Sequence, residues 1–194
     1  MSLRGKVEVW NKGVTVGPKP PLTQRQLMAI RSKIASNGSL RDLVLFSVAV
    51  ESSLGAASLV NLRVKDVSRN GTILADVSMA AGQSGYPVQF ELSDATRQLI
   101  ADWVKEKNLK ASSHLFSSRI SGSPHISARQ YARIVSEWIA LIGLDPRGYS
   151  AQSLRRSKPM LIYARTNDLD AAQAQLGHAR TRSTLRFLGI QRNS

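Results

Sequence analysis

The sequence contains, in this order, Ser153-Leu154-Arg155-Arg156-Ser157, Leu176-Gly177-His178 and Phe187-Leu188. The spacing of apolar residues predicts three helices around these strings, over residues 151–165, 169–175 and 181–188. Two arginines therefore lie near the start of one helix, a histidine follows the next, and an aromatic residue lies on the third.

The chain is strongly basic, most of all around these strings. Residues 152–194 hold eight lysines and arginines against two aspartates, a net charge of +6. The whole chain has 27 Lys and Arg against 13 Asp and Glu, a net charge of +14. This excess favours a polyanionic partner. An ordinary solvated basic surface is the alternative, whereas no basic amphipathic helix of the kind that binds membrane surfaces is evident.

Length and composition indicate one globular domain. The chain has 194 residues, of which 42% are hydrophobic, and no run of apolar residues is long enough to span a membrane. Residues 1–21 are expected to form an extended basic arm, because Gly17-Pro18-Lys19-Pro20-Pro21 forbids a helix. Residues 22–194 are expected to form the domain. The first residues lack the apolar block of a signal peptide, so a cytoplasmic location is expected, with association with the nucleoid if the protein binds DNA.

Metal and thiol chemistry are not indicated. The chain has no cysteine, and its three histidines, His114, His125 and His178, lack the spacing of metal ligands. We therefore expect no metal site and no cofactor.

The rest of the chain is predicted to be mainly helical. Further helices are expected over residues 24–35, around residues 43–50, over residues 56–62 and from Ser93 towards Lys107. Two β-like runs, 72–77 and 86–92, flank a stretch of small residues and predict one antiparallel hairpin with a wide turn. The fold class that follows is α+β, mainly helical, with one small antiparallel sheet.

A helix beginning after Ser127 has two distinct faces. Its apolar stripe is made by Tyr131, Ile134, Val135, Trp138 and Ile142. Its polar face carries Arg129, Gln130 and Arg133, which are suited to phosphate contact and base readout in a DNA major groove. A solvated face on an ordinary surface helix fits the same pattern.

The order and spacing of these strings resemble the tyrosine recombinase, or phage integrase, family from about residue 22 to residue 190. Further strings carry the resemblance: Leu62-Arg63-Val64-Lys65-Asp66-Val67, Leu115-Phe116-Ser117 and Gly143-Leu144. The resemblance implies a catalytic domain of packed helices with a small sheet, and DNA strand exchange through a 3′-phosphotyrosine.

The resemblance also implies a set of catalytic positions. In the family, two arginines clamp the phosphate that is attacked, since their planar donor groups match its oxygens. A lysine in the hairpin turn protonates the departing 5′-oxygen, two further groups assist, and a tyrosine hydroxyl attacks. The second arginine of the family falls on Arg155 and the later histidine on His178, so both are retained.

Four other positions depart from the family pattern. The first arginine falls on Gly55, the lysine near Gln83, the earlier histidine on Gln152 and the tyrosine on Phe187. A shift in register restores neither cation, because no Lys or Arg occurs between Arg41 and Arg63 or between residues 70 and 96. A phenylalanine keeps the aromatic ring but lacks the atom that forms the phosphotyrosine bond.

The sequence therefore predicts a DNA-binding recombinase homologue that has lost catalysis and acts as an accessory to, or competitor of, an active homologue. The expected DNA contacts are Arg155, His178, Arg129, Gln130, Arg133, Arg156, Lys158, Arg180 and Arg182. For Arg156, Arg180 and Arg182, a solvated surface position is an equal alternative. A monomer or weak oligomer is expected, since only a short arm precedes Thr23 and the chain stops soon after Phe187.

Two other functions stay open at this point. An active recombinase could use a different nucleophile, for which Tyr163, on the predicted helix of Arg155, is the candidate. A relict protein-interaction module could have inherited its basic charge without using it.

Overall fold

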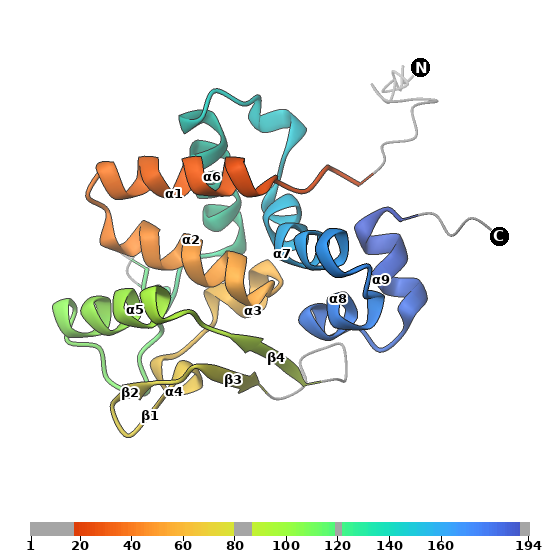
Figure 1. Cartoon of the computed structure of the whole chain (residues 1–194). Coiled ribbons are helices and arrows are strands. Elements are labelled where there is room, and N and C mark those ends of the chain that lie inside the picture. Colours follow the sequence, from red (N-terminus) through yellow and green to blue (C-terminus); the bar gives the residue numbers. More distant parts are fainter. Residues whose placement is uncertain (1–17, 80–86, 119–121, 191–194) are drawn as a thin grey trace, which may run out of the picture.

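The computed structural model describes residues 18–79, 87–118 and 122–190. In Figure 1, α1 (Gln24–Ser36), α2 (Leu40–Ser52) and α5 (Asp94–Glu106) lie in layers above the β-strands. Helix α6 (Ala128–Leu141) lies behind α1, and the last three helices form the right-hand side of the view. The prediction of a mainly helical α+β fold is confirmed.

The helices of the first half begin at side-chain caps. Thr23 and Gln26 form a capping box at the start of α1, in which each side chain bonds the backbone of the other. Helix α2 is capped by Ser39 and is the most enclosed helix of this half, since residues 44–49 are all buried. Two short helices follow, α3 (Ala56–Val60) and α4 (Val64–Val67). The sequence predicted the first of them and missed the second.

The predicted single sheet is divided into two two-stranded sheets in the described part of the chain. β1 (Ser68–Arg69) pairs antiparallel with β2 (Thr72–Ile73), and β3 (Asp76–Met79) pairs with β4 (Val88–Glu91). Asn70 and Gly71 join β1 to β2 with positive φ angles of 51° and 80°. An Asn-Gly pair is the strongest short-range signal for such a tight hairpin. The predicted strand 72–77 is therefore divided, with Thr72–Ile73 in the first hairpin and Asp76–Val77 in the second.

Helix α6 places its two faces as predicted. Ser127 caps it, and Tyr131, Ile134, Val135 and Trp138 are buried while Ile142 is half-buried. The opposite face, with Arg129 and Arg133, is exposed. A short 3-10 helix, η1 (Pro146–Gly148), leads from α6 to the last part of the chain.

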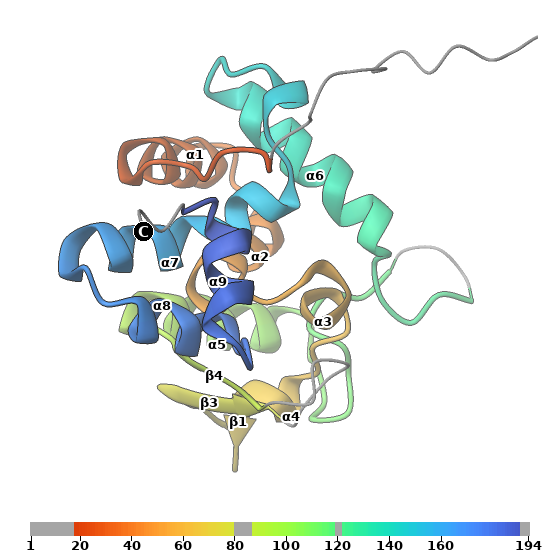
Figure 2. The same cartoon turned by 90° about the vertical axis from the view of Figure 1, so that its right-hand side faces the viewer.

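The final helices are α7 (Ala151–Thr166), α8 (Leu169–Leu176) and α9 (Thr181–Leu188). α7 continues through Pro159, whose missing N–H cannot bond the carbonyl of Arg155. Ala172, Leu176 and Leu188 form a second small core between these helices, separate from the main one. In Figure 2, α9 lies in front of α7 with α8 beside it. No helix among the described residues is long and apolar enough to cross a membrane.

Candidate functional site

Arg155 lies in the second turn of α7 and is half-buried. Its Nε donates a hydrogen bond to the carbonyl of Ser53, at 2.8 Å, and its guanidinium carbon lies 5.0 Å from the centre of the Phe187 ring. Burial, and then the nearby charge of Arg156, lower the pKa of Arg155. None of the ion pairs among the described residues involves Arg155. A partly desolvated cation without a carboxylate partner is suited to bind an external anion.

Gly55 lies beside this guanidinium, just before α3. A Cβ atom at Gly55 would be 3.7 Å from Nη1 of Arg155, an ordinary contact distance. The structure thus brings together the two positions at which the resemblance implies a pair of arginines. Position 55 has no side chain, so no atom of that residue fills the space beside Nη1 of Arg155.

His178 follows α8 and faces the same group. Its Nδ1 lies 3.2 Å from Oγ1 of Thr184, and its carbonyl accepts a hydrogen bond from Gln173 at 2.9 Å. Burial, and then the charge of Arg155, lower the pKa of His178. The imidazole is therefore biased towards its neutral form, in which it can donate one hydrogen bond and accept another.

Phe187, on α9, lies at the centre of these residues. Its ring meets His178 edge-on, with the ring centres 5.4 Å apart, and it contacts the guanidinium groups of Arg155 and Arg156. The structure therefore places the ring at position 187 against the arginine that the resemblance assigns to the phosphate. The ring carries no hydroxyl group.

Arg156 has a different position from the one expected of a DNA contact. Its side chain is only 8% exposed. Its Nε donates to the carbonyl of Phe187, and its Nη1 donates to the carbonyl of Lys19 at 2.6 Å. Because these donors already have internal acceptors, Arg156 joins α7 to α9 and to the segment before α1 instead of reaching a DNA surface.

Lys158 lies at the edge of a cavity of about 1030 Å³ between α7, α8 and the β3–β4 hairpin. Its Nζ donates to the carbonyl of Glu51 at 2.8 Å, and Gln175 donates to the same carbonyl at 2.8 Å. Burial lowers the pKa of Lys158, while the charges of Glu51 and Glu91 oppose that shift. The ammonium group is thus partly used within the protein.

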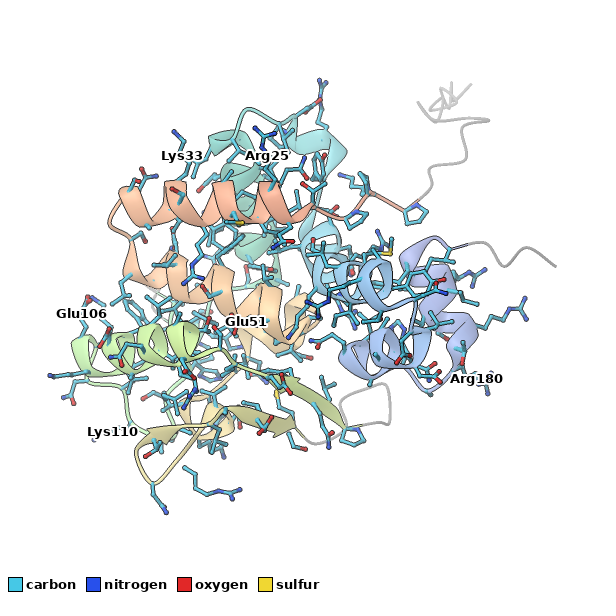
Figure 3. The ribbon with its side chains drawn as sticks, in the orientation of Figure 1. Arg25, Lys33, Glu51, Glu106, Lys110 and Arg180 are labelled. Atoms are coloured by element: carbon cyan, nitrogen blue, oxygen red, sulfur yellow. The ribbon has the colours of Figure 1, made fainter. Side chains whose placement is uncertain are left out.

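Glu51 and Ser53 are site residues that the sequence did not reveal. The Glu51 carboxylate accepts hydrogen bonds from the backbone and the hydroxyl of Ser93, at 2.9 and 2.8 Å, at the start of α5. Figure 3 shows Glu51 where α2, α5 and α7 come close together. No local motif could identify these residues, because Lys158 and Arg155 reach them from more than 100 positions further along the chain.

The other predicted residues have mixed positions. Gln152 is exposed on the first turn of α7, and Gln83 lies outside the described residues. Arg180 and Arg182 are exposed at the start of α9, where Figure 3 shows Arg180 at the edge of the molecule. Arg133 lies 3.9 Å from Glu137 on the exposed face of α6.

Gln130 is less available for base readout than expected. Its side-chain oxygen accepts a hydrogen bond from the backbone N–H of Ser127, at 2.7 Å. The backbone N–H of Gln130 in turn donates to the Ser127 hydroxyl. This capping box fixes the amide at the start of α6, so Gln130 serves the helix first.

No hydrogen bond or ring contact joins a described tyrosine to Arg155. Tyr131 is buried, and burial raises the pKa of its hydroxyl. The Tyr149 hydroxyl accepts from Gln26 at 3.5 Å, whereas Tyr163 packs on the second core cluster. Tyr163 lies eight residues after Arg155, about 12 Å along the helix axis. Among the described residues there is also no group of three or more side chains that could hold a metal ion.

Comparison with known proteins agrees with this arrangement. The model of the phage integrase family matches residues 21–192. The chain belongs to the phage integrase family. Its relatives include the probable integrase/recombinase YoeC of Bacillus subtilis, with 28% identity over 81% of this chain and 82% of the relative. The tyrosine recombinase XerH of Campylobacter jejuni is 23% identical over 79% of this chain and 42% of that protein.

Solved structures of tyrosine recombinases share the fold. XerA recombinase superposes with a TM-score of 0.72 at 14% identity, over 90% of this chain and 60% of that one. XerH bound to the palindromic difH substrate, in a post-cleavage complex, gives 0.72 at 21% identity, over 86% and 48%. The Tn1549 transposon integrase with transposon right end DNA gives 0.68 at 17% identity, over 90% and 63%. This chain thus spans about half to three fifths of these structures.

Proposed function

We propose that this member of the phage integrase family binds duplex DNA, holds a backbone phosphate at Arg155 and His178, and does not cut the strand. One observation carries the proposal: the ring of Phe187 contacts both Arg155 and His178, yet it has no hydroxyl group that could attack the phosphate. Affinity for the phosphate and the ability to cleave it are therefore separated in this site.

Two chemical deficits oppose strand cleavage. Without a tyrosine hydroxyl at position 187, the covalent intermediate has no attacking atom there. Gly55 also leaves the phosphate with one guanidinium where the family uses two, and loss of one such arginine costs roughly 10³- to 10⁵-fold in rate by analogy with arginine fingers. The two deficits act on the same step, so a slow residual reaction through the usual route is not expected.

DNA as the ligand is supported by charge and by relatives. The chain has a net charge of +14, and Arg129, Arg133, Arg180 and Arg182 are exposed. XerH and the Tn1549 integrase were solved with DNA. An accessory to an active homologue, or a competitor for its sites, is the role that fits binding without cleavage.

Duplex affinity measured as a function of salt tests DNA binding. We expect dissociation constants of roughly 10⁻⁶ to 10⁻⁴ M, weakening linearly on a log–log plot as salt rises, because phosphate contacts release condensed counterions. Fluorescence anisotropy with a labelled duplex gives the dissociation constant at each salt concentration, and from these the slope of the log–log plot. Binding that is absent, or that does not change with salt, contradicts the proposal.

Charge reversal on α6 separates DNA binding from a protein-interaction role. The double variant Arg129→Glu/Arg133→Glu should abolish measurable duplex binding if α6 lies on DNA. The matched control is Arg25→Glu/Lys33→Glu, the same change of charge on α1, where both side chains are exposed (Figure 3). Equal losses in both variants would show that total charge, and not the α6 face, governs binding.

A further inference from the structure

We propose that Phe187 forms an aromatic shelf that orients the guanidinium of Arg155 for a phosphate, and that Arg156 is the positioning residue that holds this shelf. The inference rests on the proposed function and assigns a present role to the ring that stands where the family has its nucleophile.

The guanidinium of Arg155 is fixed by two contacts. Its Nε bonds the carbonyl of Ser53 at 2.8 Å, and its carbon lies 5.0 Å from the centre of the Phe187 ring, within cation–π range. A planar group held at one edge and over one face has little freedom to turn. Its two terminal nitrogens make no hydrogen bond within the described part of the chain, so they are left for a two-point contact with phosphate oxygens.

The ring is itself held by Arg156. The guanidinium carbon of Arg156 lies 4.6 Å from the same ring centre, and its Nε donates to the carbonyl of Phe187. One residue therefore contacts both the side chain and the backbone at position 187. Its Nη1 also bonds the carbonyl of Lys19 at 2.6 Å, which ties the segment before α1 to the same point.

The electrostatics explain why this contact is more than packing. Arg156 is 8% exposed and takes part in none of the ion pairs of the described residues, so its charge is balanced only by carbonyl dipoles and the ring. A buried cation without a carboxylate is costly unless its geometry is well satisfied. An ammonium group lacks the planar fork that bonds two carbonyls and lies against a ring, so lysine is a poor substitute.

His178 also contacts the ring. Its ring meets that of Phe187 edge-on. Its Nδ1 lies 3.2 Å from Oγ1 of Thr184, which precedes Phe187 by one turn of α9. Together, Arg156 and His178 fix α9 so that the ring stays against Arg155. The loss of the hydroxyl removed the attacking atom and left this orienting role intact.

A double-mutant cycle between Phe187 and Arg155 tests the shelf. Phe187→Leu and Phe187→Tyr are measured alone and combined with Arg155→Gln, by anisotropy with a fixed duplex. We expect Phe187→Leu to raise Kd about threefold to tenfold, in line with the strength of a partly buried cation–π contact. Phe187→Tyr should keep the wild-type affinity, and Phe187→Leu should have almost no further effect once Arg155 is glutamine. An equal effect in both backgrounds, or no effect in the wild type, overturns the proposal.

Arg156→Lys tests the positioning role at constant charge. We expect it to raise Kd as Phe187→Leu does, and to speed amide exchange in α9 without changing exchange in α2. Unchanged affinity and unchanged exchange would refute the role of Arg156. If this variant does not fold, the Phe187 series decides by itself, because position 187 is only half-buried.

A measurement without DNA distinguishes failure of the shelf from failure of DNA binding. In the free protein, the Nε–H NMR signal of Arg155 should be shifted by the ring and protected by Ser53, and Phe187→Leu should remove the ring shift. A shifted signal with no duplex binding rejects the proposed ligand and keeps the shelf. Duplex binding with an Arg155 signal insensitive to Phe187→Leu rejects the shelf alone.

Discussion

At residue 53, a serine adopts a backbone conformation that normally belongs to glycine. Ser53 has φ 52° and ψ 26° at the end of α2 and is 1% exposed. This conformation turns its carbonyl towards Arg155, so the helix end and the site are linked through one strained residue.

The strain can be released by substitution. Ser53→Gly should increase the free energy of unfolding by about 0.5–1 kcal/mol, because a residue with a Cβ pays about 1–2 kcal/mol in the left-handed region and glycine does not. The neighbouring Ser52→Gly, at the last residue of α2, should instead be destabilising by about 1 kcal/mol, because it also removes the hydroxyl that accepts from the N–H of Leu54. Urea unfolding of both variants checks this, and a loss of stability in Ser53→Gly contradicts it.

His114 gives a residue-scale prediction about pH. Burial, and then the charges of His125 and Arg63, hold the pKa of His114 below its ordinary value of 6.5, and the charge of Asp66 opposes the shift. The folded state therefore binds this proton less readily than the unfolded state. Its contribution to stability is present above pH 6.5 and is lost as the pH falls through the lower folded value.

An NMR titration of the His114 ring measures this pKa directly. In His114→Gln, the decline of unfolding free energy between about pH 7 and about pH 5 should be shallower than in the wild type. A pKa of His114 at or above 6.5 would contradict the account.

At the scale of elements, the start of α6 is fixed by the Ser127–Gln130 capping box. Ser127→Ala should lower the free energy of unfolding by about 1 kcal/mol, since it leaves the N–H of Gln130 without its acceptor. The matched control is Ser136→Ala on the same helix, whose hydroxyl only bonds the carbonyl of Ala132. Thermal unfolding compares the two, and equal effects would argue against the cap.

The elements were predictable where the signal is local. Ser93 and Ser127 mark the helix starts that the structure has, and the apolar stripe of α6 faces the core. The division of the sheet also has a local signal, because Asn70-Gly71 is typical of a tight hairpin turn. The prediction relied on the apolar residues of 72–77 and treated them as one strand. α4, a helix of four residues, is too short for periodicity to show.

At the scale of the whole molecule, the sequence singled out residues that lie together in the fold, but it did not predict the hydrogen bonds among them. The family resemblance assigned Arg155, His178 and Phe187, and the fold brings these residues into contact. The burial of Arg156 could not be foreseen, since its acceptors, the carbonyls of Lys19 and Phe187, lie 137 and 31 positions away. Contacts over such separations are set by helix packing, which no local pattern encodes.

The same contacts bring the two ends of the described chain together. Pro18 lies 3.8 Å from where a Cβ of Gly189 would be, and Arg156 bonds both the segment before α1 and α9. In Figure 1 the described segment before α1 and the end of α9 lie on the right-hand side of the view. Pro18 and Lys19 therefore pack against the end of α9 and against Arg156.

Covalent trapping on DNA tests the central claim, that the site holds a phosphate without cleaving it. The full chain is incubated with nicked suicide duplexes selected for binding, in which a cut strand cannot be rejoined, and the products are separated on a denaturing gel. We predict salt-sensitive binding and no covalent protein–DNA product at saturating protein. A covalent product that persists in denaturant, and that Tyr163→Phe or another tyrosine substitution abolishes, would contradict the account.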